Sequence, residues 1–487
     1  MKLKGINTLV IGAGKSGIAS ARFLRSRGAH VLLNDRSDLG CLKSLESEGI
    51  ILESGERWTD DTATGPQNSL SSGDAVLNRD SGPALFSNKE LVVISPGVPA
   101  GSGPLAHAIS DAELRGIEVI SEVELASRFV KAPVIAVTGT NGKSTTTSLI
   151  GEILDLGGAK VFTGGNLGIP FTRYAVEGDQ AETVILEVSS FQLERIKKFR
   201  PWISVLLNIS PDHLDRYSSM KEYVEAKKRL FMNQRGGDFA VVNMDDPVIA
   251  GLTDQINESV SIIPFGTNRV YPGGIYLDNS VIVSDIEGRK VEIDIESINP
   301  DGIHVTENVM AAVAVSLLCG VPEKIICGAV KGFHGLPHRM EFIGESCNIK
   351  FYNDSKATNV GALIKNLENV NKKVVLIAGG RDKGGSYGPL KKFVDHKVSG
   401  LVLIGEASEK IRTVLGDLTK TVLASTMEEA VNCAWSLAES GDIILLSPAC
   451  SSFDMFGSYV ERGNAFKDGV RRLIAEAERS GREVVNA

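Results

Sequence analysis

A glycine-rich turn followed by a lysine and two hydroxyl residues stands at 139–145, with the sequence Gly-Thr-Asn-Gly-Lys-Ser-Thr. It follows an apolar, strand-like run and opens a stretch of helical periodicity at 143–156. Backbone N–H groups of such a turn can bind phosphate oxygens, Lys143 can reach the terminal phosphates, and Ser144 can ligate Mg²⁺. Val137 stands where the Walker A motif has its first glycine. The context of strand, turn and helix still predicts a phosphate-binding site.

Two further polar residues, Glu187 and His213, follow apolar runs at 184–186 and 203–209. An unpaired carboxylate is costly to bury, and ligands gather at the carboxyl ends of parallel strands. Either residue alone is better explained as a capped or hydrogen-bonded polar group. Beside a phosphate-binding turn, the pair predicts a hard-cation site that bridges a nucleotide and a substrate.

Lys227 lies on the apolar face of a predicted helix. It follows Met220 by seven residues and Tyr223 by four, so all three share that face, whereas Lys228 points about 100° away. The other apolar positions of this face are Val224 and Phe231. Ser219 and Glu222 have the spacing of a capping box at the start of the helix.

A lysine held among apolar side chains has a depressed pKa and a nucleophilic, neutral amine. Such an amine can add CO₂ and become a carbamate, which can then ligate a metal ion. The alternative is a lysine whose amine reaches solvent past the apolar side chains. The sequence leaves both interpretations of Lys227 open.

Near the N-terminus the segment 12–17 reads Gly-Ala-Gly-Lys-Ser-Gly, and Asp35 ends the next apolar run. This pattern brings a backbone turn close to a pyrophosphate and offers an acid to a ribose hydroxyl. A dinucleotide, another nucleoside diphosphate and plain strand–helix packing all remain possible here. Three polar clusters near the C-terminus, at 353–359, 379–383 and 447–452, suggest capture of an anionic substrate, although each could be simple turn chemistry.

The elements that must position these residues form three successive α/β blocks, each with apolar runs alternating with helical patterns. In the first block the strand-like runs are 8–12, 30–35, 90–97 and 117–121. In the second they are 132–139, 184–188, 203–209 and 239–243, followed by short alternating strands over 262–300 and a helix over 306–319. In the third they are 373–380, 400–405, 421–425 and 442–449. A Ser- and Gly-rich insertion is predicted at 59–88.

Composition excludes several classes of protein. The chain has 487 residues, a net charge of −8, 43% hydrophobic residues and 23% charged residues, as in ordinary globular proteins. The acidic excess argues against a nucleic-acid partner. The apolar runs are too short for membrane insertion, and no signal peptide is expected. The six cysteines form no CxxC pair and are expected to be small buried residues of a cytoplasmic protein.

These motifs together resemble those of the Mur ligase family, from Gly12 to about Gly463. The phosphate-binding turn alone is shared with folylpolyglutamate synthases, so the more specific segments decide. The segments that carry the resemblance are GTNGKST (139–145), GGNLG (164–168), LEVSSFQLE (186–194), DHLDRY (212–217), Ala-Lys (226–227), GLPHRME (335–341), NDSKATN (353–359) and LLSPACSSFD (445–454).

The resemblance implies an α/β fold of three consecutive domains. These are a Rossmann-like UDP-substrate domain at 1–125, a central P-loop ATPase domain at 126–334 and a Rossmann-like amino-acid domain at 335–487. In its details the match is closest to the members that add D-glutamate to UDP-N-acetylmuramoyl-L-alanine in peptidoglycan precursor synthesis. It implies ATP and Mg²⁺ as cofactors, with an acyl phosphate formed first and a tetrahedral intermediate after attack by the amine. Closure of the third domain over the acyl phosphate is a further expectation.

The family motifs assign roles residue by residue. UDP-substrate contacts are expected from Ser16, Asp35, Arg36, Ser95, Gly97, Asn166 and Ser189. ATP contacts are expected from Gly139, Thr140, Asn141, Gly142, Lys143, Ser144, Thr145, Asn308, Arg339 and Asp354. Metal ligands would be Ser144, Glu187, His213 and carbamylated Lys227, and the catalytic residues Lys143, Glu187, His213 and Lys227. D-glutamate contacts are expected from Lys356, Thr358, Lys383, Ser452 and Tyr459, the last of which stands where the family usually has phenylalanine.

Three other functions remain as alternatives. A sister Mur ligase or a folylpolyglutamate synthase-like ligase would share the turn at 139–145. A nicotinamide-dependent oxidoreductase would explain the segment 12–17 and Asp35, but not that turn. A non-catalytic nucleotide switch would bind ATP without releasing phosphate in response to an amino acid. The sequence does not fix the oligomeric state, for which a monomer is the simplest expectation.

Overall fold

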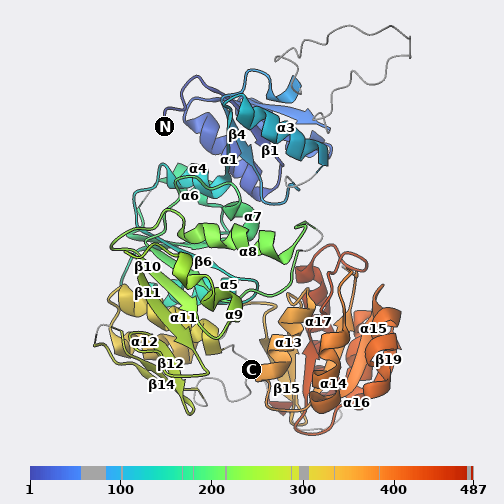
Figure 1. The fold of residues 1–487 in the computed structure, drawn as a ribbon. Coiled ribbons are helices and arrows are strands. Elements are labelled where there is room, and N and C mark those ends of the chain that lie inside the picture. Colours follow the sequence, from blue (N-terminus) through green and yellow to red (C-terminus); the bar gives the residue numbers. More distant parts are fainter. Residues whose placement is uncertain are drawn as a thin grey trace, which may run out of the picture. The chain divides into compact units, whose positions relative to one another are not determined.

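The structure is a computed structural model (Figure 1) that describes residues 1–55, 84–99, 103–166, 168–178, 180–213, 216–286, 288–295, 306–333, 335–382, 384–479 and 484–485. Most of the predicted insertion at 59–88, and the predicted contact residue Lys383, lie outside these residues. The chain divides into two compact units. The first comprises residues 1–139, 150–209 and 213–264, and the second comprises 140–149, 210–212 and 265–487.

The first sheet is parallel throughout, in the order β3-β2-β1-β4-β5. Its strands are β1 (Asn7–Ile11), β2 (His30–Asp35), β3 (Ile50–Ser54), β4 (Leu91–Ile94) and β5 (Glu118–Ser121), and its helices are α1 (Lys15–Ser26), α2 (Ser44–Ser47), α3 (Gly103–Leu114) and α4 (Glu122–Ser127). The chain order reverses direction between β1 and β4. Such a reversal is the usual ligand position in doubly wound sheets.

The second sheet has nine strands in the order β14-β13-β12-β11-β10-β9-β6-β8-β7. The strands are β6 (Val134–Thr138), β7 (Val161–Gly165), β8 (Thr183–Glu187), β9 (Ile203–Leu206), β10 (Phe239–Asn243), β11 (Ser261–Gly266), β12 (Ile275–Asp278), β13 (Val281–Ser284) and β14 (Glu292–Asp294). From β10 to β7 all pairs are parallel, whereas β12, β13 and β14 are antiparallel. The expected short strands over 262–300 are therefore confirmed as far as Asp294.

The helices that belong to the chain between β6 and β15 are α5 (Lys143–Leu156), α6 (Phe171–Glu177), α7 (Ser190–Leu193), α8 (Met220–Lys228), α9 (Pro247–Ala250), α11 (Thr306–Leu318) and α12 (Glu323–Gly332). Short 3₁₀ turns occupy Gly40–Leu42, Ala84–Phe86, Arg229–Phe231, Thr253–Gln255, Gly388–Leu390 and Gly416–Leu418. None of the helices in the described ranges is long and apolar enough to span a bilayer.

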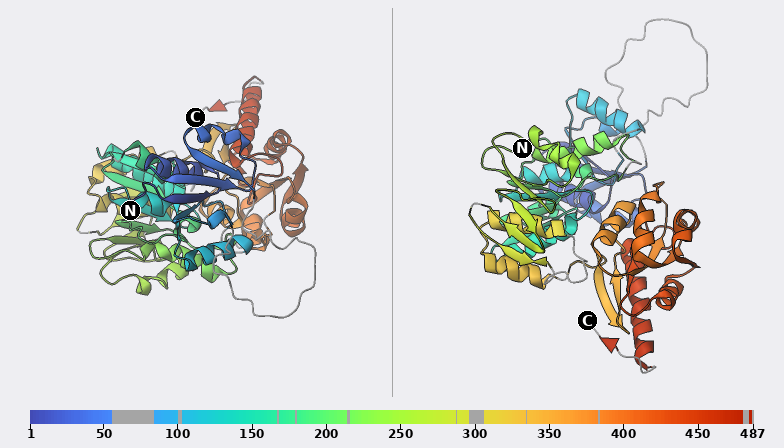
Figure 2. Two further views of the ribbon diagram at one scale, coloured as in Figure 1. Left: turned by 90° about the horizontal axis from the view of Figure 1, so that it is seen from above. Right: turned by 60° about the horizontal axis from the view of Figure 1, so that its bottom comes forward.

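The third sheet has the order β19-β18-β17-β20-β16-β15-β21. Its strands are β15 (Glu341–Ser346), β16 (Ile349–Asn353), β17 (Val374–Gly379), β18 (Val398–Ile404), β19 (Lys420–Ala424), β20 (Ile443–Leu446) and β21 (Val484–Val485). Its helices are α13 (Val360–Asn369), α14 (Lys391–Lys397), α15 (Ser408–Leu415), α16 (Met427–Leu437) and α17 (Tyr459–Arg479), the long red helix of Figure 2.

Alternation along β17 explains why this sheet is covered on both faces. Leu376 belongs to one hydrophobic cluster, with α13, α14 and α15, while its neighbours Val375 and Ile377 belong to a second cluster with α16 and α17. Successive side chains of a strand point to opposite faces, so a continuous apolar run requires helices on both sides. The α/β architecture predicted from such runs is confirmed.

Within the first unit, one hydrophobic cluster continues from the first sheet into the second. It includes Phe23 of α1, Leu125 of α4, Phe171 of α6 and Leu186 of β8, all fully buried. The two sheets therefore share one continuous apolar core within this unit.

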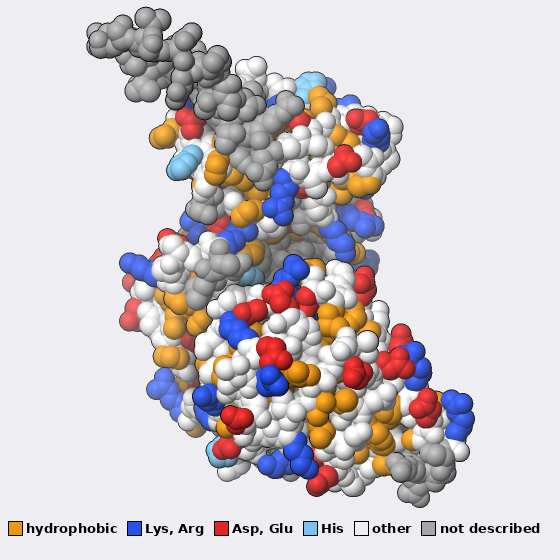
Figure 3. Space-filling model, turned by 90° about the vertical axis from the view of Figure 1, so that its right-hand side faces the viewer, with side chains coloured by type: hydrophobic (Ala, Val, Ile, Leu, Met, Phe, Trp, Pro, Cys, Tyr) orange, Lys and Arg blue, Asp and Glu red, His pale blue; other side chains and the backbone are white. Residues whose placement is uncertain are grey.

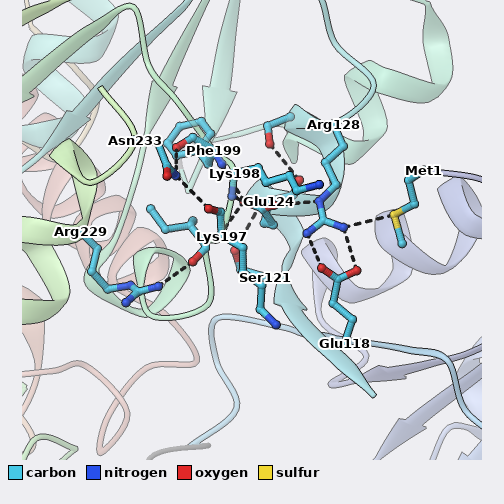
Figure 4. A network of polar contacts seen from close by, with 12 residues as sticks. Met1, Glu118, Ser121, Glu124, Arg128, Lys197, Lys198, Phe199, Arg229 and Asn233 are labelled. Atoms are coloured by element: carbon cyan, nitrogen blue, oxygen red, sulfur yellow. Dashed lines mark hydrogen bonds and ion pairs between the residues drawn. The ribbon is translucent and has the colours of Figure 1, made fainter. Parts of the chain in front are cut away.

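Glu124 of α4 forms a network of hydrogen bonds with the segment 197–199 (Figure 4). Its carboxylate accepts hydrogen bonds from the backbone N–H groups of Lys197, Lys198 and Phe199, and from Nε of Arg128 at 2.7 Å. The side chain is fully buried. A buried carboxylate with this many donors ties α4 firmly to the segment 197–199.

On the face drawn in Figure 3, acidic and basic side chains are interspersed, and the net charge of the whole chain is −8.

All six cysteines are free thiols. The expectation that they are buried is wrong for five of them, because only Cys450 is buried and Cys41 is exposed. Small thiols tolerate these half-buried positions because they are only weakly polar.

Candidate active site

The segment 12–17 forms a tight turn between β1 and α1. Gly12 has φ +94°, and a Cβ on Gly17 would lie 1.7 Å from the Gly12 carbonyl oxygen. Ser95, which follows β4, donates a hydrogen bond from Oγ to the same oxygen at 2.9 Å. Two expected UDP-substrate elements, the glycine turn and Ser95, therefore lie side by side where the strand order reverses.

Asp35 lies against the same turn. Its Oδ2 accepts a hydrogen bond from the Ala13 N–H at 2.7 Å, and its Oδ1 accepts from the Ser37 N–H and hydroxyl. Partial burial alone would raise the pKa of Asp35, but the hydrogen bonds from Ser37 and Ala13 outweigh it and hold the pKa below its usual value. Asp35 is therefore an anion at neutral pH and shapes the turn. Arg36, the next residue, is exposed.

Glu187 ends β8 and is buried to 3% exposure. Its Oε1 accepts a hydrogen bond from Nδ2 of Asn166 at 2.6 Å, so an expected UDP-substrate residue and an expected metal ligand are in direct contact. Glu187 pairs with Val137 across the parallel ladder, which places its carboxylate beside the end of β6. Ser189 begins α7 with a complete capping box shared with Gln192.

His213 follows β9 in a left-handed conformation, with φ +56°. A left-handed backbone is uncommon for a residue other than glycine and occurs often at functional sites. The edge of its ring meets Phe191 of α7, with the ring centres 4.8 Å apart. The imidazole is thus placed by a neighbouring aromatic ring as well as by its own backbone.

Lys227 is 1% exposed, so its predicted place on the buried face of α8 is confirmed. Its Nζ donates a hydrogen bond to the Gly139 carbonyl oxygen at 2.7 Å and lies 4.7 Å from the centre of the Tyr223 ring. Lys228 instead forms an ion pair with Glu225. The amine of Lys227 therefore lies beside the first glycine of the phosphate-binding turn.

The expected capping box of α8 is only half correct. Ser219 Oγ accepts a hydrogen bond from the Glu222 N–H, but the Glu222 carboxylate accepts from the N–H of Ser218 rather than that of Ser219. The helix start is unaffected.

The phosphate-binding turn itself belongs to the second unit from Thr140 onward. A Cβ on Gly142, which has φ +83°, would lie 2.1 Å from Oδ1 of Asn308, so glycine is required there. Nη2 of Arg339 donates to Oγ of Ser144 at 2.5 Å, and Lys143 Nζ donates to the Thr140 carbonyl oxygen at 2.7 Å. Asn308 and Arg339, both expected to contact ATP, are therefore at this turn.

Asp354, another expected ATP contact, follows β16 and is fully enclosed. Burial raises the pKa of Asp354 to about 7, although a hydrogen bond from Ser447 and the charge of Arg339 act against the increase. Asn366 also donates to its carboxylate. No sequence motif singles out Asn366, which lies on the following helix, α13.

The expected D-glutamate residues gather in part. Lys356 Nζ lies 4.1 Å from the centre of the Tyr459 ring, and Ser452 is buried to 2% exposure. Thr358 is partly buried in the same loop as Lys356. Cation–π contact of this kind holds an ammonium group without neutralising it. Lys356, which is expected to contact D-glutamate, is therefore held beside the ring of Tyr459.

Sequence reasoning missed Arg462, a fully buried arginine on α17. It donates to the Ser355 hydroxyl and carbonyl oxygens and to the carbonyl oxygens of Cys450 and Ser451. It thereby joins the loop that carries Lys356 to the loop that carries Ser452. The one signal in the sequence is that Arg462 falls on the apolar face of the amphipathic helix α17.

A magnesium ion would need ligands from outside the chain as well. No three His, Cys, Asp or Glu side chains are grouped to hold a metal ion anywhere in the described ranges. The expected set contains only Glu187 and His213 of these types. Mg²⁺ is usually held by one or two protein groups together with substrate phosphates and water, so the donors fit a metal that arrives with a nucleotide.

Comparisons with known proteins identify relatives of this chain. Residues 137–316 match the Mur ligase middle domain, and residues 338–450 match the Mur ligase glutamate ligase domain. The chain is 44% identical over 477 residues to a UDP-N-acetylmuramoylalanine–D-glutamate ligase of Geotalea daltonii, covering 97% of this chain and 99% of the relative. A ligase of the same name from Geobacter metallireducens is 44% identical, with the same coverage.

Solved structures share the fold. A pseudomurein peptide ligase type C from Methanothermus fervidus is 20% identical, with a TM-score of 0.56 and coverage of 96% of this chain and 100% of the other. The UDP-N-acetylmuramate-alanine ligase of Thermotoga maritima is 18% identical, with a TM-score of 0.55 and coverage of 97% and 99%. Together with whole-length relatives at 44% identity, these findings show that this chain belongs to the Mur ligase family of ATP-dependent amide ligases.

Proposed function

We propose that this chain joins D-glutamate to the alanyl carboxylate of UDP-N-acetylmuramoyl-L-alanine, with ATP converted to ADP and phosphate. The reaction is a step of peptidoglycan precursor synthesis. Whole-length similarity to relatives of that name is the observation that carries the proposal. The glycine turn beside Ser95, the Asn166–Glu187 contact and the Lys356–Tyr459 pair support it.

In the first half-reaction, a carboxylate oxygen of the alanyl group attacks the γ-phosphorus of ATP, and ADP leaves. Both reactants are anions, so their approach has to be stabilised by positive charge. Lys143 supplies one such charge from the phosphate-binding turn. We propose that Ser144, Glu187 and His213 would hold Mg²⁺, which would supply further positive charge to the phosphoryl oxygens.

In the second half-reaction, the amine of D-glutamate attacks the acyl carbon and gives a tetrahedral oxyanion. The oxyanion collapses to the amide with loss of phosphate, and the amine loses a proton. We propose that Lys356, Thr358, Lys383 and Ser452 bind the two carboxylates of D-glutamate, with Tyr459 as the aromatic wall beside Lys356. Contact with the Tyr459 ring would hold the Lys356 ammonium group in position before the amino acid binds.

Lys227 has a proposed role as a carbamate. Its amine, enclosed and beside Gly139, would add CO₂, lose a proton and offer oxygen ligands near the metal. Because the reaction consumes ATP and a UDP-linked substrate, we also propose the cytoplasm as its compartment.

Phosphate release over a panel of amino acids tests the proposal directly. With ATP, Mg²⁺ and UDP-N-acetylmuramoyl-L-alanine present, release should require D-glutamate and be absent with L-glutamate, L-lysine and meso-diaminopimelate. Release with meso-diaminopimelate or L-lysine instead would identify a sister ligase. ATP binding without release in response to any amino acid would indicate a nucleotide switch.

A further inference from the structure

Arg216 lies between two loops of the first unit that are far apart in sequence. Its Nη1 donates a hydrogen bond to the Pro96 carbonyl oxygen at 2.9 Å, and its Nη2 lies 3.4 Å from Oε2 of Glu194. The guanidinium carbon is 3.8 Å from the centre of the Phe191 ring. Its side chain is only 12% exposed. One planar group therefore contacts the loop after β4 and two residues of the α7 region.

These contacts complete a continuous series across the first unit. Ser95 donates to the Gly12 carbonyl oxygen, so the loop after β4 is fixed to the glycine turn after β1. Arg216 fixes the next residue of that loop, Pro96, to the ring of Phe191. Phe191 in turn meets the ring of His213. The turn that is to hold the UDP group and the histidine that is to act at the other end of the substrate are thus connected through Arg216.

The geometry needs an arginine. Only a guanidinium can stack flat on a ring and also donate to two acceptors in its own plane, whereas a lysine offers a single point charge. The Nε of Arg216 is buried without an acceptor in the described part of the chain, which costs free energy. Arg216 is therefore better suited to holding the two loops in place than to increasing the stability of the fold.

We propose that Arg216 is a positioning residue, which sets the distance between the nucleotide-binding loop of the first sheet and the His213 loop of the second. This inference rests on the proposed function. A UDP-linked substrate that spans the two loops presents its carboxylate correctly only if that distance is fixed. An error of about 1 Å in the placement of reacting groups can cost about a hundredfold in rate.

Steady-state kinetics of Arg216→Met and Arg216→Lys test the proposal. We expect kcat/KM for the UDP-linked substrate to fall by about a hundredfold in Arg216→Met, with a smaller loss in Arg216→Lys. KM for ATP and for D-glutamate should stay within about twofold of wild type. The dissociation constant of UDP alone, measured by calorimetry, should not change, because UDP engages only the first of the two loops.

Arg27→Met is the matched control. Arg27 also connects the first and second sheets, since its Nη2 donates to the Ala175 carbonyl oxygen at 3.4 Å and its guanidinium lies over the rings of Phe23 and Phe129. It takes no part in the series from Gly12 to His213. Arg27→Met removes a contact between the same two sheets and should leave the kinetic constants near wild type.

Three results would overturn the proposal. Arg216→Met could keep kcat/KM within about twofold of wild type. It could lose affinity for UDP alone in proportion to its loss of kcat/KM, which would make Arg216 a simple binding residue. Arg27→Met could show the same kinetic loss, which would indicate general loosening between the sheets. A wild-type enzyme inactive with D-glutamate would instead refute the proposed function itself, and the positioning role with it.

Discussion

Lys227 and Lys228 are neighbours in sequence with opposite surroundings. Lys227 is 1% exposed and reaches the Gly139 carbonyl oxygen, whereas the Lys228 side chain is 28% exposed and pairs with Glu225. One step along a helix turns a side chain by about 100°, and here that step separates a buried position from the surface. Substituting each lysine in turn therefore compares a buried amine with a solvent-accessible one on the same helix.

We expect Lys227→Ala to reduce kcat by more than the ten- to hundredfold typical of residues that only orient a metal ligand. The reason is loss of both the amine beside Gly139 and the proposed carbamate. Lys228→Ala should keep kcat within about threefold, because it loses only a surface ion pair. The measurement is phosphate release under saturating substrates.

A small carboxylic acid such as acetate should partly restore Lys227→Ala, since it can supply the missing oxygens. Independently of activity, ¹³C NMR in ¹³C-bicarbonate should show a carbamate signal in wild type that is absent from Lys227→Ala and present in Lys228→Ala. Absence of that signal from wild type would contradict the carbamate, and equal damage from both substitutions would contradict the placement of α8.

Helices and strands are predicted best from the sequence where residues close together in the chain determine their ends. The helix over 143–156 appears with the predicted ends because a turn, an apolar stripe and Gly157-Gly158 are all local. Strand β3 (Ile50–Ser54) was not predicted, since only part of its run is apolar and it lies at a sheet edge. Edge strands are exposed and therefore carry weaker patterns.

Contacts between distant elements could not be predicted in this way. The Lys227–Gly139 contact joins residues 88 positions apart, and the Arg216–Pro96 contact joins residues 120 positions apart. Periodicity placed Lys227 on a buried face, but the identity of its acceptor depends on how β6 and α8 pack. Motif resemblance supplied roles for Glu187 and Asn166, whereas their mutual hydrogen bond emerged only from the fold.

Glu122 on α4 gives a prediction about stability at this scale. Its Oε1 accepts hydrogen bonds from the Thr172 N–H and hydroxyl of α6, and it is fully buried. Burial raises the pKa of Glu122 to about 7 against those hydrogen bonds. The folded state therefore retains a proton that the unfolded state releases near pH 4.5, and the contribution of Glu122 to stability falls as pH rises from about 4.5 to 7.

Glu122→Gln keeps an uncharged acceptor for Thr172 and removes this titration. Relative to wild type, the thermal midpoint of Glu122→Gln should improve by several degrees between pH 5 and pH 8. Glu118→Gln is the control, because the pKa of Glu118 is shifted in the opposite direction to that of Glu122. The hydrogen bond and charge of Arg128 hold the pKa of Glu118 below its usual value, so this variant should lose stability relative to wild type as pH rises from strongly acidic values towards the usual glutamate pKa. A flat difference for Glu122→Gln from pH 5 to 8 would contradict its raised pKa.

At the scale of the whole molecule, the proposed chemistry is divided between two compact units. Glu187, His213 and Lys227 belong to the first, and Ser144 with the rest of the phosphate-binding turn belongs to the second. Lys356 and Tyr459 also belong to the second unit. The proposed reaction would draw residues from both units, and closure of the third domain during turnover stays a prediction.

Ligand binding should therefore couple the unfolding of the two units. In calorimetric scans of the full chain, a non-hydrolysable ATP analogue with Mg²⁺ should raise the midpoint of the second unit most. The UDP-linked substrate alone should raise that of the first, because each ligand stabilises the unit it binds, by about 2.7 kcal/mol at a hundred times its dissociation constant. With both present, the stabilisation should exceed the sum of the separate effects if Glu187 and His213 act, as proposed, on the metal that arrives with the nucleotide.

Ser144→Ala distinguishes coupling from simple addition. It should leave the shift due to the UDP-linked substrate unchanged and reduce the extra shift seen with both ligands, since the hydroxyl proposed to hold Mg²⁺ is missing. Thr147→Ala, on the same helix α5 and fully buried, controls for a general effect on that helix. If wild type shows only additive shifts, the two units bind their ligands independently. The metal would then not be shared between them, and a mechanism that requires Ser144, Glu187 and His213 to act on one ion would fail.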